Sequence, residues 1–174
     1  MYSYPEFYQL YSELKTMFRE RCNNSDPYYC QAWLNYYHTD EFVAWHRHTL
    51  SLHCGYHGFF CVDAEPSKTT YRLPDETEFD VVGKNNLLVL SENQGDFHRT
   101  WPWHLPEPRI TIAFDIVPGA RINPSDRLNH WLPIWYAPVT ELEYVSLSKG
   151  EFWGFESLLG YHNKIVTVFK LNRK

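Results

Sequence analysis

The sequence lacks the features that would place the protein in a membrane or direct it out of the cell. No apolar run in its 174 residues approaches the roughly 18–20 residues of a membrane-spanning helix. The first residues, Met1 to Glu6, contain neither the charged segment nor the apolar segment of a signal peptide. We therefore expect a cytosolic (cytoplasmic) protein that has no membrane partner.

An excess of basic residues is also missing. The chain has 16 Lys and Arg against 21 Asp and Glu, which gives a net charge of −5 at pH 7. The isoelectric point is about 6.0. Nucleic acids and anionic membranes bind to basic surfaces. We therefore expect no nucleic-acid partner.

No two cysteines have the Cys-x-x-Cys spacing of zinc knuckles and redox motifs. In a reducing compartment, isolated cysteines are most simply buried thiols. We expect this of all four, which are Cys22, Cys30, Cys54 and Cys61.

Aromatic residues and prolines are abundant. Aromatics make up 18% of the chain, with 13 Tyr and 7 Trp, and 11 prolines are spread along it. Aromatic residues favour strands and prolines favour loops, so this composition indicates a β-rich fold. The length suits one domain with a full core, and no repeat or linker divides residues 1–174.

Hydrophobic periodicity predicts one helix followed by strands. Residues 6–21 have an apolar stripe with helical spacing, formed by Phe7, Leu10, Tyr11, Leu14, Met17 and Phe18. Short segments rich in β-branched and aromatic residues, bounded by Pro, Gly, Asn or Asp, predict eight strands. They are residues 29–37, 42–52, 58–63, 69–73, 78–82, 86–90, 109–117 and 165–171. Residues 119–160 are harder to assign and suit loops plus an edge hairpin over one rim.

Many short strands without intervening helices favour a closed or double-sheet antiparallel fold. We therefore predict a mainly β protein, a double-stranded β-helix (jelly roll, cupin-like) with an N-terminal α-helix braced against one sheet. In this prediction, residues 29–117 form the barrel core, and residues 118–174 add C-terminal strands and loops on the rim.

Two histidines at positions i and i+2 suggest a metal site. Side chains two residues apart on a strand share a face, so His46 and His48 would point the same way and Arg47 the opposite way. A third histidine, His98, follows a turn after a buried strand. By itself the His-x-His spacing is also compatible with histidines exposed to water.

The segment after His98 strengthens this hypothesis. Residues 109–116 alternate strictly, with Ile110, Ile112, Phe114 and Ile116 on one face and Arg109, Thr111, Ala113 and Asp115 on the other. If the second face is buried, Arg109 needs an anion, because an unpaired buried charge costs several kcal/mol. Arg109 would then bind a carboxylate. The alternative is an edge strand with Arg109 in solvent.

The remaining histidines carry weaker signals. His53 and His57 lie in a glycine-flanked segment and are expected in a loop, although either could replace His48 as a ligand. The others have no partner spacing and are expected at the surface or in structural roles. They are His38, His104, His130 and His162.

These motifs, in this order, resemble the Fe(II)/2-oxoglutarate-dependent dioxygenases. The likeness is greatest to the small prolyl-4-hydroxylase-like group, including oxygenases often encoded by phage and bacterial genomes. It covers residues 33–117, half the chain, and the strand after Arg109 is its most specific part. Residues 32–36 resemble the strand that supplies a cosubstrate-facing tyrosine, and residues 58–63 resemble the family's Tyr-Tyr strand. If the chain is phage-encoded, the host cytoplasm is the expected compartment.

The resemblance implies an oxygenase that hydroxylates an unidentified substrate with Fe(II) and 2-oxoglutarate as cofactor and cosubstrate. It implies that the metal is bound by His46, His48 and His98. The cosubstrate carboxylate would be bound by Arg109, Thr111 and Tyr36, and the protein could form a homo-oligomer. No catalytic residue beyond the metal ligands is implied.

Two positions depart from the family pattern. Residue 48 is histidine where the family has Asp or Glu, so a bound ion would keep its full +2 charge. The acid could instead come from elsewhere in the chain, or His48 could be no ligand at all. Cys61 stands where the Tyr-Tyr strand normally has its second tyrosine, so Tyr36 or Tyr71 would have to compensate.

Two other readings stay open. A cupin that binds metal or a small molecule through three histidines would use His46, His48 and His98, with His53 in the place of a glutamate, but it gives Arg109 and Thr111 no role. A metal-free jelly roll with a structural role could use the aromatic residues of 131–155 as an interface. Those residues are Trp131, Trp135, Tyr136, Phe152, Trp153 and Phe155.

Overall fold

In the residues that a computed structural model of the chain describes, there are one α-helix and two antiparallel sheets. It describes residues 3–22, 26–48, 55–92, 96–122, 131–134, 153–157 and 166–173. The expected mainly β architecture is confirmed. No helix of the described residues is long and apolar enough to cross a membrane.

The N-terminal helix α1 (Pro5–Cys22) forms where the apolar stripe predicted it. Its buried side chains are Phe7, Leu14, Met17 and Phe18, and each contributes roughly 1.5–3 kcal/mol by burial. The Phe18 ring lies edge-on against the rings of Tyr28 and Tyr56, which belong to the large sheet. The helix is therefore fixed to the sheet by its hydrophobic face.

The large sheet has seven strands in the order β8-β1-β7-β2-β5-β10-β9. Their bounds are β1 (Tyr28–Tyr37), β2 (Tyr56–Asp63), β5 (Leu87–Glu92), β7 (Arg109–Pro118), β8 (Trp131–Ile134), β9 (Trp153–Ser157) and β10 (Val166–Arg173). The small sheet has the order β4-β3-β6, formed by β3 (Ser67–Arg72), β4 (Glu78–Gly83) and β6 (Phe97–Thr100). A 3-10 turn (Gly119–Arg121) follows β7.

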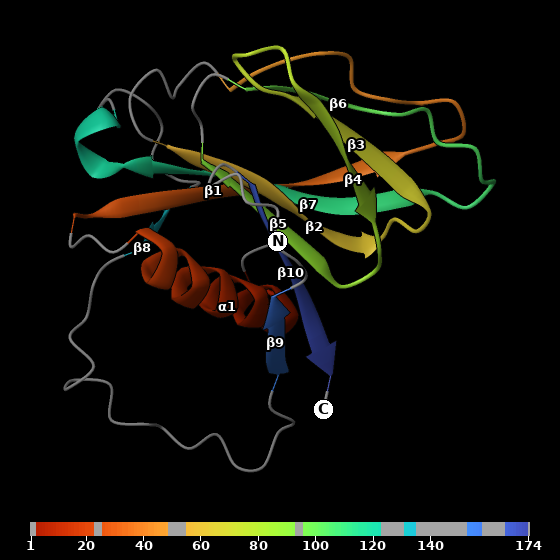
Figure 1. Cartoon of the computed structure of the whole chain (residues 1–174). Coiled ribbons are helices and arrows are strands. Elements are labelled where there is room, and N and C mark those ends of the chain that lie inside the picture. Colours follow the sequence, from red (N-terminus) through yellow and green to blue (C-terminus); the bar gives the residue numbers. More distant parts are fainter. Residues whose placement is uncertain are drawn as a thin grey trace.

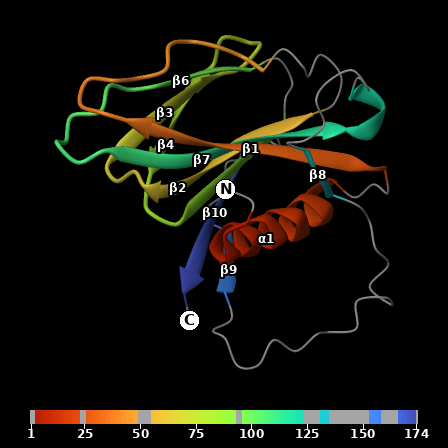
Figure 2. The same cartoon turned by 180° about the vertical axis from the view of Figure 1, so that it is seen from behind.

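The elements form three layers. Figures 1 and 2 show α1 on one side of the large sheet and the small sheet on its other side. One hydrophobic cluster lies between α1 and the large sheet and includes Phe18, Leu88 and Ile116. A second cluster joins the two sheets and includes Cys61, Tyr71 and Val89. The strands are therefore covered on both faces near their middle, and the space between the sheets is protein interior.

The segment predicted as a strand over residues 42–52 is not a regular strand in its described part. His46 and His98 exchange backbone hydrogen bonds in an isolated bridge, and the backbone N–H of Thr100 donates to the Val43 carbonyl oxygen. The segment thus runs beside β6 with an interrupted ladder. Positions 49–52 lie outside the described residues.

Sequence reasoning missed three strands. The segment that delivers His98 is itself β6, paired with β3. The edge hairpin expected within residues 119–160 is wrong for the described strands, because β8 pairs with β1 and β9 with β10 at opposite edges. Of the aromatics considered as an interface, Trp131 lies on β8, and Trp153 and Phe155 lie on β9. Trp135, Tyr136 and Phe152 lie outside the described residues.

Candidate metal centre

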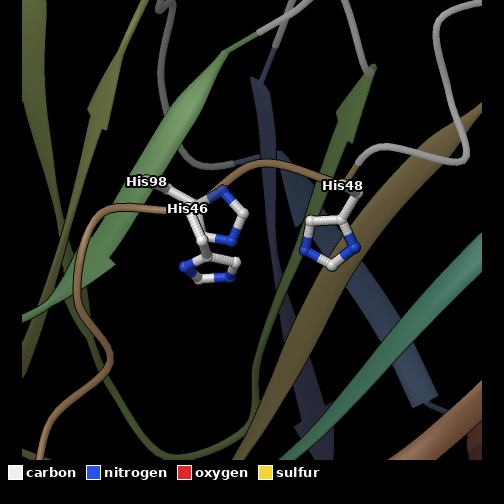
Figure 3. Close-up of side chains that lie close together, drawn as sticks. All are labelled: His46, His48 and His98. Atoms are coloured by element: carbon white, nitrogen blue, oxygen red, sulfur yellow. The ribbon is translucent and has the colours of Figure 1, made fainter.

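Three histidines from two chain segments meet at one point between the sheets. His46 and His48 come from the segment beside β6, and His98 comes from β6. One ring nitrogen of each lies within 4.8 Å of the others, close enough to hold a metal ion. Figure 3 shows the three rings gathered there. The structure therefore brings together all three histidines that the sequence analysis named as ligands.

The backbone pairing explains this convergence. The bridge between His46 and His98 sets their ring centroids 4.1 Å apart. His48 lies two residues further along, and its ring centroid is 5.2 Å from that of His98. Arg47 turns the other way and lies over the ring of Phe97. The i, i+2 spacing thus places both histidines on the inner side even though the ladder is interrupted.

A carbonyl oxygen and a carboxylate lie beside two of the rings. Nδ1 of His46 lies 2.9 Å from the Ala44 carbonyl oxygen. Nδ1 of His48 lies 2.6 Å from Oδ1 of Asp115 on β7. When one ring nitrogen is engaged in this way, the other keeps its electron pair for a metal. This arrangement leaves Nε2 of both rings as the candidate ligand atoms.

His98 is nearly buried, and its pKa lies well below 6.5. Burial is the main cause, and the neighbouring imidazoles His57, His46 and His48 add to it because like charges would repel. His98 is therefore a neutral imidazole at physiological pH, which is the form that binds metals.

Sequence reasoning placed His57 in a loop, and that is wrong: it lies on β2 and is 2% exposed. Its ring stacks at 4.6 Å on His48 and at 4.8 Å on His98, measured between centroids. Burial and the adjacent imidazoles keep its pKa well below 6.5. The signal for this position was present in the alternation of β2, in which His57, Phe59 and Cys61 share one face. His53 lies outside the described residues.

A cavity of about 180 Å³ adjoins the histidines. It is smaller than the roughly 300–1,000 Å³ of pockets for drug-sized ligands, so it suits a small molecule. Its lining includes His46, His48, His57 and His98, and a second group of polar residues on β1 and β7. That second group consists of Asn35, Tyr37, Arg109 and Thr111.

Arg109 is buried in the wall of this cavity, with 4% of its surface exposed. Burial lowers the pKa of its guanidinium, and Tyr37 opposes that shift. The Tyr37 ring centroid lies 5.1 Å from the guanidinium carbon. Among the residues that the structure describes, no carboxylate forms an ion pair with Arg109. Because arginine stays protonated in proteins, the cavity wall carries a positive charge that an anionic ligand would neutralise.

The structure places Thr111 beside Arg109 but does not bring Tyr36 to them. Thr111 is buried, and its hydroxyl lies 3.5 Å from Nδ2 of Asn35. Tyr36 is 51% exposed and is not among the residues that line the cavity. The register of β1 and β7 pairs Tyr37, not Tyr36, with Arg109. A shift of one residue along a strand moves a side chain to the other face, so Tyr37 is the tyrosine on the Arg109 side.

Other residues singled out in the sequence have separate locations. Tyr71 is fully buried on β3, with its ring stacked 5.3 Å from His98. Cys61 and Cys30 are buried free thiols, and burial raises their pKa values to about 11 and about 12. His38 and His104 are exposed. His130 and His162 lie outside the described residues, as does Cys54, and the side chain of Cys22 is not described.

Comparisons with known proteins identify no family for this chain. No protein-family model matches it, and no curated protein sequence matches it. Among solved structures it is similar to a chain described as "Non-heme monooxygenase, ThoJ-Ni complex", with 12% sequence identity and a TM-score of 0.46. The match covers 65% of this chain and 53% of that chain, so it spans about half the length of that structure. A similarity this weak carries no argument about function, which must be argued from the residues of the site.

Proposed function

We propose that this protein is an oxygenase that uses a divalent metal, Fe(II), and 2-oxoglutarate to hydroxylate a small substrate or an exposed group of a larger one. The observation that carries the proposal is one cavity in which three convergent histidines face a buried arginine without a carboxylate partner among the described residues. The histidines suit a metal, and the arginine suits the far carboxylate of a diacid.

The strand order supports a jelly roll as the scaffold. Along the chain, β1, β2, β5 and β7 enter the large sheet in the order β1-β7-β2-β5, and β3, β4 and β6 enter the small one. The segment that contains His46 extends the small sheet beside β6. The chain thus alternates between these four strands of the large sheet and four segments of the small one, as in a double-stranded β-helix. In this scaffold the metal residues lie on one sheet and the arginine on the other.

The donor set fits a divalent transition metal. His46, His48 and His98 would hold the ion, with the Ala44 carbonyl and Asp115 fixing two of the rings. Imidazoles suit Fe, Zn, Cu and Ni, and three neutral ones leave the ion its full +2 charge. That charge would strengthen the binding of an anionic 2-oxo acid. With the metal and the 2-oxo acid bound, dioxygen would be the oxidant: one oxygen atom would go to the substrate and the other to the 2-oxo acid, which would lose CO₂.

The chain's own residues bind and orient the cosubstrate. Arg109 would form charge-assisted hydrogen bonds with the carboxylate remote from the metal, and the Thr111 hydroxyl would donate a further bond. Tyr37, whose ring lies against the guanidinium, would hold Arg109 in place. The apolar parts of the wall, which include Trp33, Val43 and Phe59, keep bulk water away from the charges.

The test compares two 2-oxo acids that differ only in the remote carboxylate. Anaerobic titration with Fe(II) and 2-oxoglutarate should give the visible charge-transfer band of a chelated 2-oxo acid. 2-Oxobutyrate can chelate in the same way but has nothing for Arg109 to bind. We expect the unchanged protein to bind 2-oxoglutarate far more tightly than 2-oxobutyrate, and Arg109→Ala to lose that preference.

The matched control is Arg72→Ala, because Arg72 pairs with Glu78 and lies on the small sheet outside the cavity. This variant should keep the preference for 2-oxoglutarate. If Arg109→Ala keeps the preference as well, the assignment of the carboxylate site is wrong. If no 2-oxo acid gives the band although Fe(II) binds, the dependence on 2-oxoglutarate is wrong and a metal site alone remains.

A further inference from the structure

A second group of side chains that could bind a metal shares His98 with the three-histidine set and is more deeply buried. His57, Asp96 and His98 each offer one donor atom, and these three atoms lie within 4.8 Å of one another. Their residues are 2%, 1% and 8% exposed. His57 and His98 line the cavity, whereas Asp96 does not.

The spacing of His57 and Asp96 is typical of two ligands on one ion. Nε2 of His57 lies 3.4 Å from Oδ2 of Asp96, and neither ring nitrogen of His57 has a hydrogen-bond partner among the described residues. Ligands about 2.0–2.2 Å from a tetrahedral ion lie about 3.3–3.6 Å from each other.

The ring of His57 gives a second reason. A buried polar group without a hydrogen bond costs free energy, and both ring nitrogens of His57 are buried without a hydrogen-bond partner among the described residues. A divalent cation would bind the ring nitrogen that carries no proton.

We propose that His57, Asp96 and His98 form a second position for a divalent transition-metal ion, an inner set of two histidines and one carboxylate. The outer set is His46, His48 and His98. A neutral imidazole has one electron pair to give, so His98 serves one set at a time. The two sets are therefore alternative positions for a single ion. The inner position supplies the carboxylate that residue 48 does not.

The net charge of the ion together with its ligands would differ between the two positions. In the outer set it keeps +2, and in the inner set the carboxylate reduces this to +1, which weakens its attraction for an anionic ligand. All three residues of the outer set line the cavity, whereas Asp96 of the inner set does not. The outer position is therefore the one that faces ligands in the cavity, and the inner position is a storage position. This inference concerns metal binding alone and does not require the proposed 2-oxoglutarate dependence.

The test uses Co(II) alone, whose ligand-field spectrum reports binding, added to protein freed of metal with a chelator. Four proteins are compared: the unchanged chain, an outer-set variant (His46→Ala with His48→Ala), an inner-set variant (His57→Gln with Asp96→Asn) and a variant without either set (His98→Ala). We expect one equivalent of Co(II) in each of the first three, with different spectra for the two double variants. We expect no saturable binding in His98→Ala.

Two results would overturn the proposal. One is an outer-set variant that is folded, by near-ultraviolet circular dichroism, and binds no Co(II). The other is a second equivalent bound by the unchanged chain. If the outer-set variant does not fold, His46→Gln with His48→Gln replaces it, and adding Asp96→Asn to that variant must abolish binding. Failure of the proposed function would look different, because it would leave these Co(II) results intact and remove only the preference for 2-oxoglutarate.

Discussion

Replacing Asp115 with asparagine should weaken metal binding in the outer set without removing a ligand. Oδ1 of Asp115 lies 2.6 Å from Nδ1 of His48, and both side chains are largely buried. A carboxylate at this distance favours the tautomer with the proton on Nδ1, which leaves the Nε2 electron pair for a metal. Asparagine has nearly the same shape, but it is uncharged and can present its NH₂ group to the ring.

The magnitude follows from the role of a carboxylate that orients a metal ligand without binding the metal itself. Losing the carboxylate that orients a metal-binding histidine typically weakens metal affinity about 10–100-fold, or about 1.4–2.7 kcal/mol. A complete loss is not expected, because His46 is oriented independently by the Ala44 carbonyl. We therefore expect Asp115→Asn to fall within this range and His48→Ala to have a larger effect.

The assay is competition for Zn(II) between the protein and a chromophoric chelator at fixed pH. To isolate the outer set, each substitution is made in a chain that also carries His57→Gln and Asp96→Asn. The matched control is Asp63→Asn, an exposed aspartate on β2 that should leave the affinity unchanged. An Asp115→Asn affinity within twofold of the control would refute the reasoning. It would mean that Asp115 does not orient a ligand, or that His48 does not bind the ion.

Two further predictions concern the fold. In Gly58→Ala the new Cβ would lie 2.0 Å from the Val89 carbonyl oxygen and 2.7 Å from the Phe114 ring. We therefore expect the free energy of unfolding, measured with urea, to fall by about 1–3 kcal/mol. A loss below about 0.5 kcal/mol would contradict this packing. The second prediction concerns pH. Because His57 and His98 have pKa values below 6.5 in the fold, the unfolded chain binds more protons below that pH. The metal-free protein should therefore lose stability as pH falls below about 6.5, by up to about 1.4 kcal/mol per pH unit for each histidine. Urea midpoints from about pH 7.5 to pH 5 measure this, His57→Gln should reduce the slope, and an unchanged slope in that variant would contradict the assignment.

Local pattern was enough to predict much of this protein. The apolar stripe of residues 6–21 predicted α1, because a 3.6-residue period depends only on neighbours along the chain. The strict alternation of residues 109–116 likewise predicted β7 and placed Arg109, Thr111 and Asp115 on one face. The i, i+2 spacing put His46 and His48 on the same side. These features follow from the geometry of a single segment.

Tertiary structure decided which of these faces meet and which residues complete the site. The pairing of β1 with β7 chose Tyr37 over Tyr36 as the neighbour of Arg109, and a single segment carries no information about register. The interrupted pairing beside β6 joined His46 to His98, which are far apart in the sequence. His57 came to His98 only because β2 and β6 lie in facing sheets, and no local pattern reports such a contact. The sequence therefore determined the types of group available for binding, and the packing of the two sheets determined which of them share one ion.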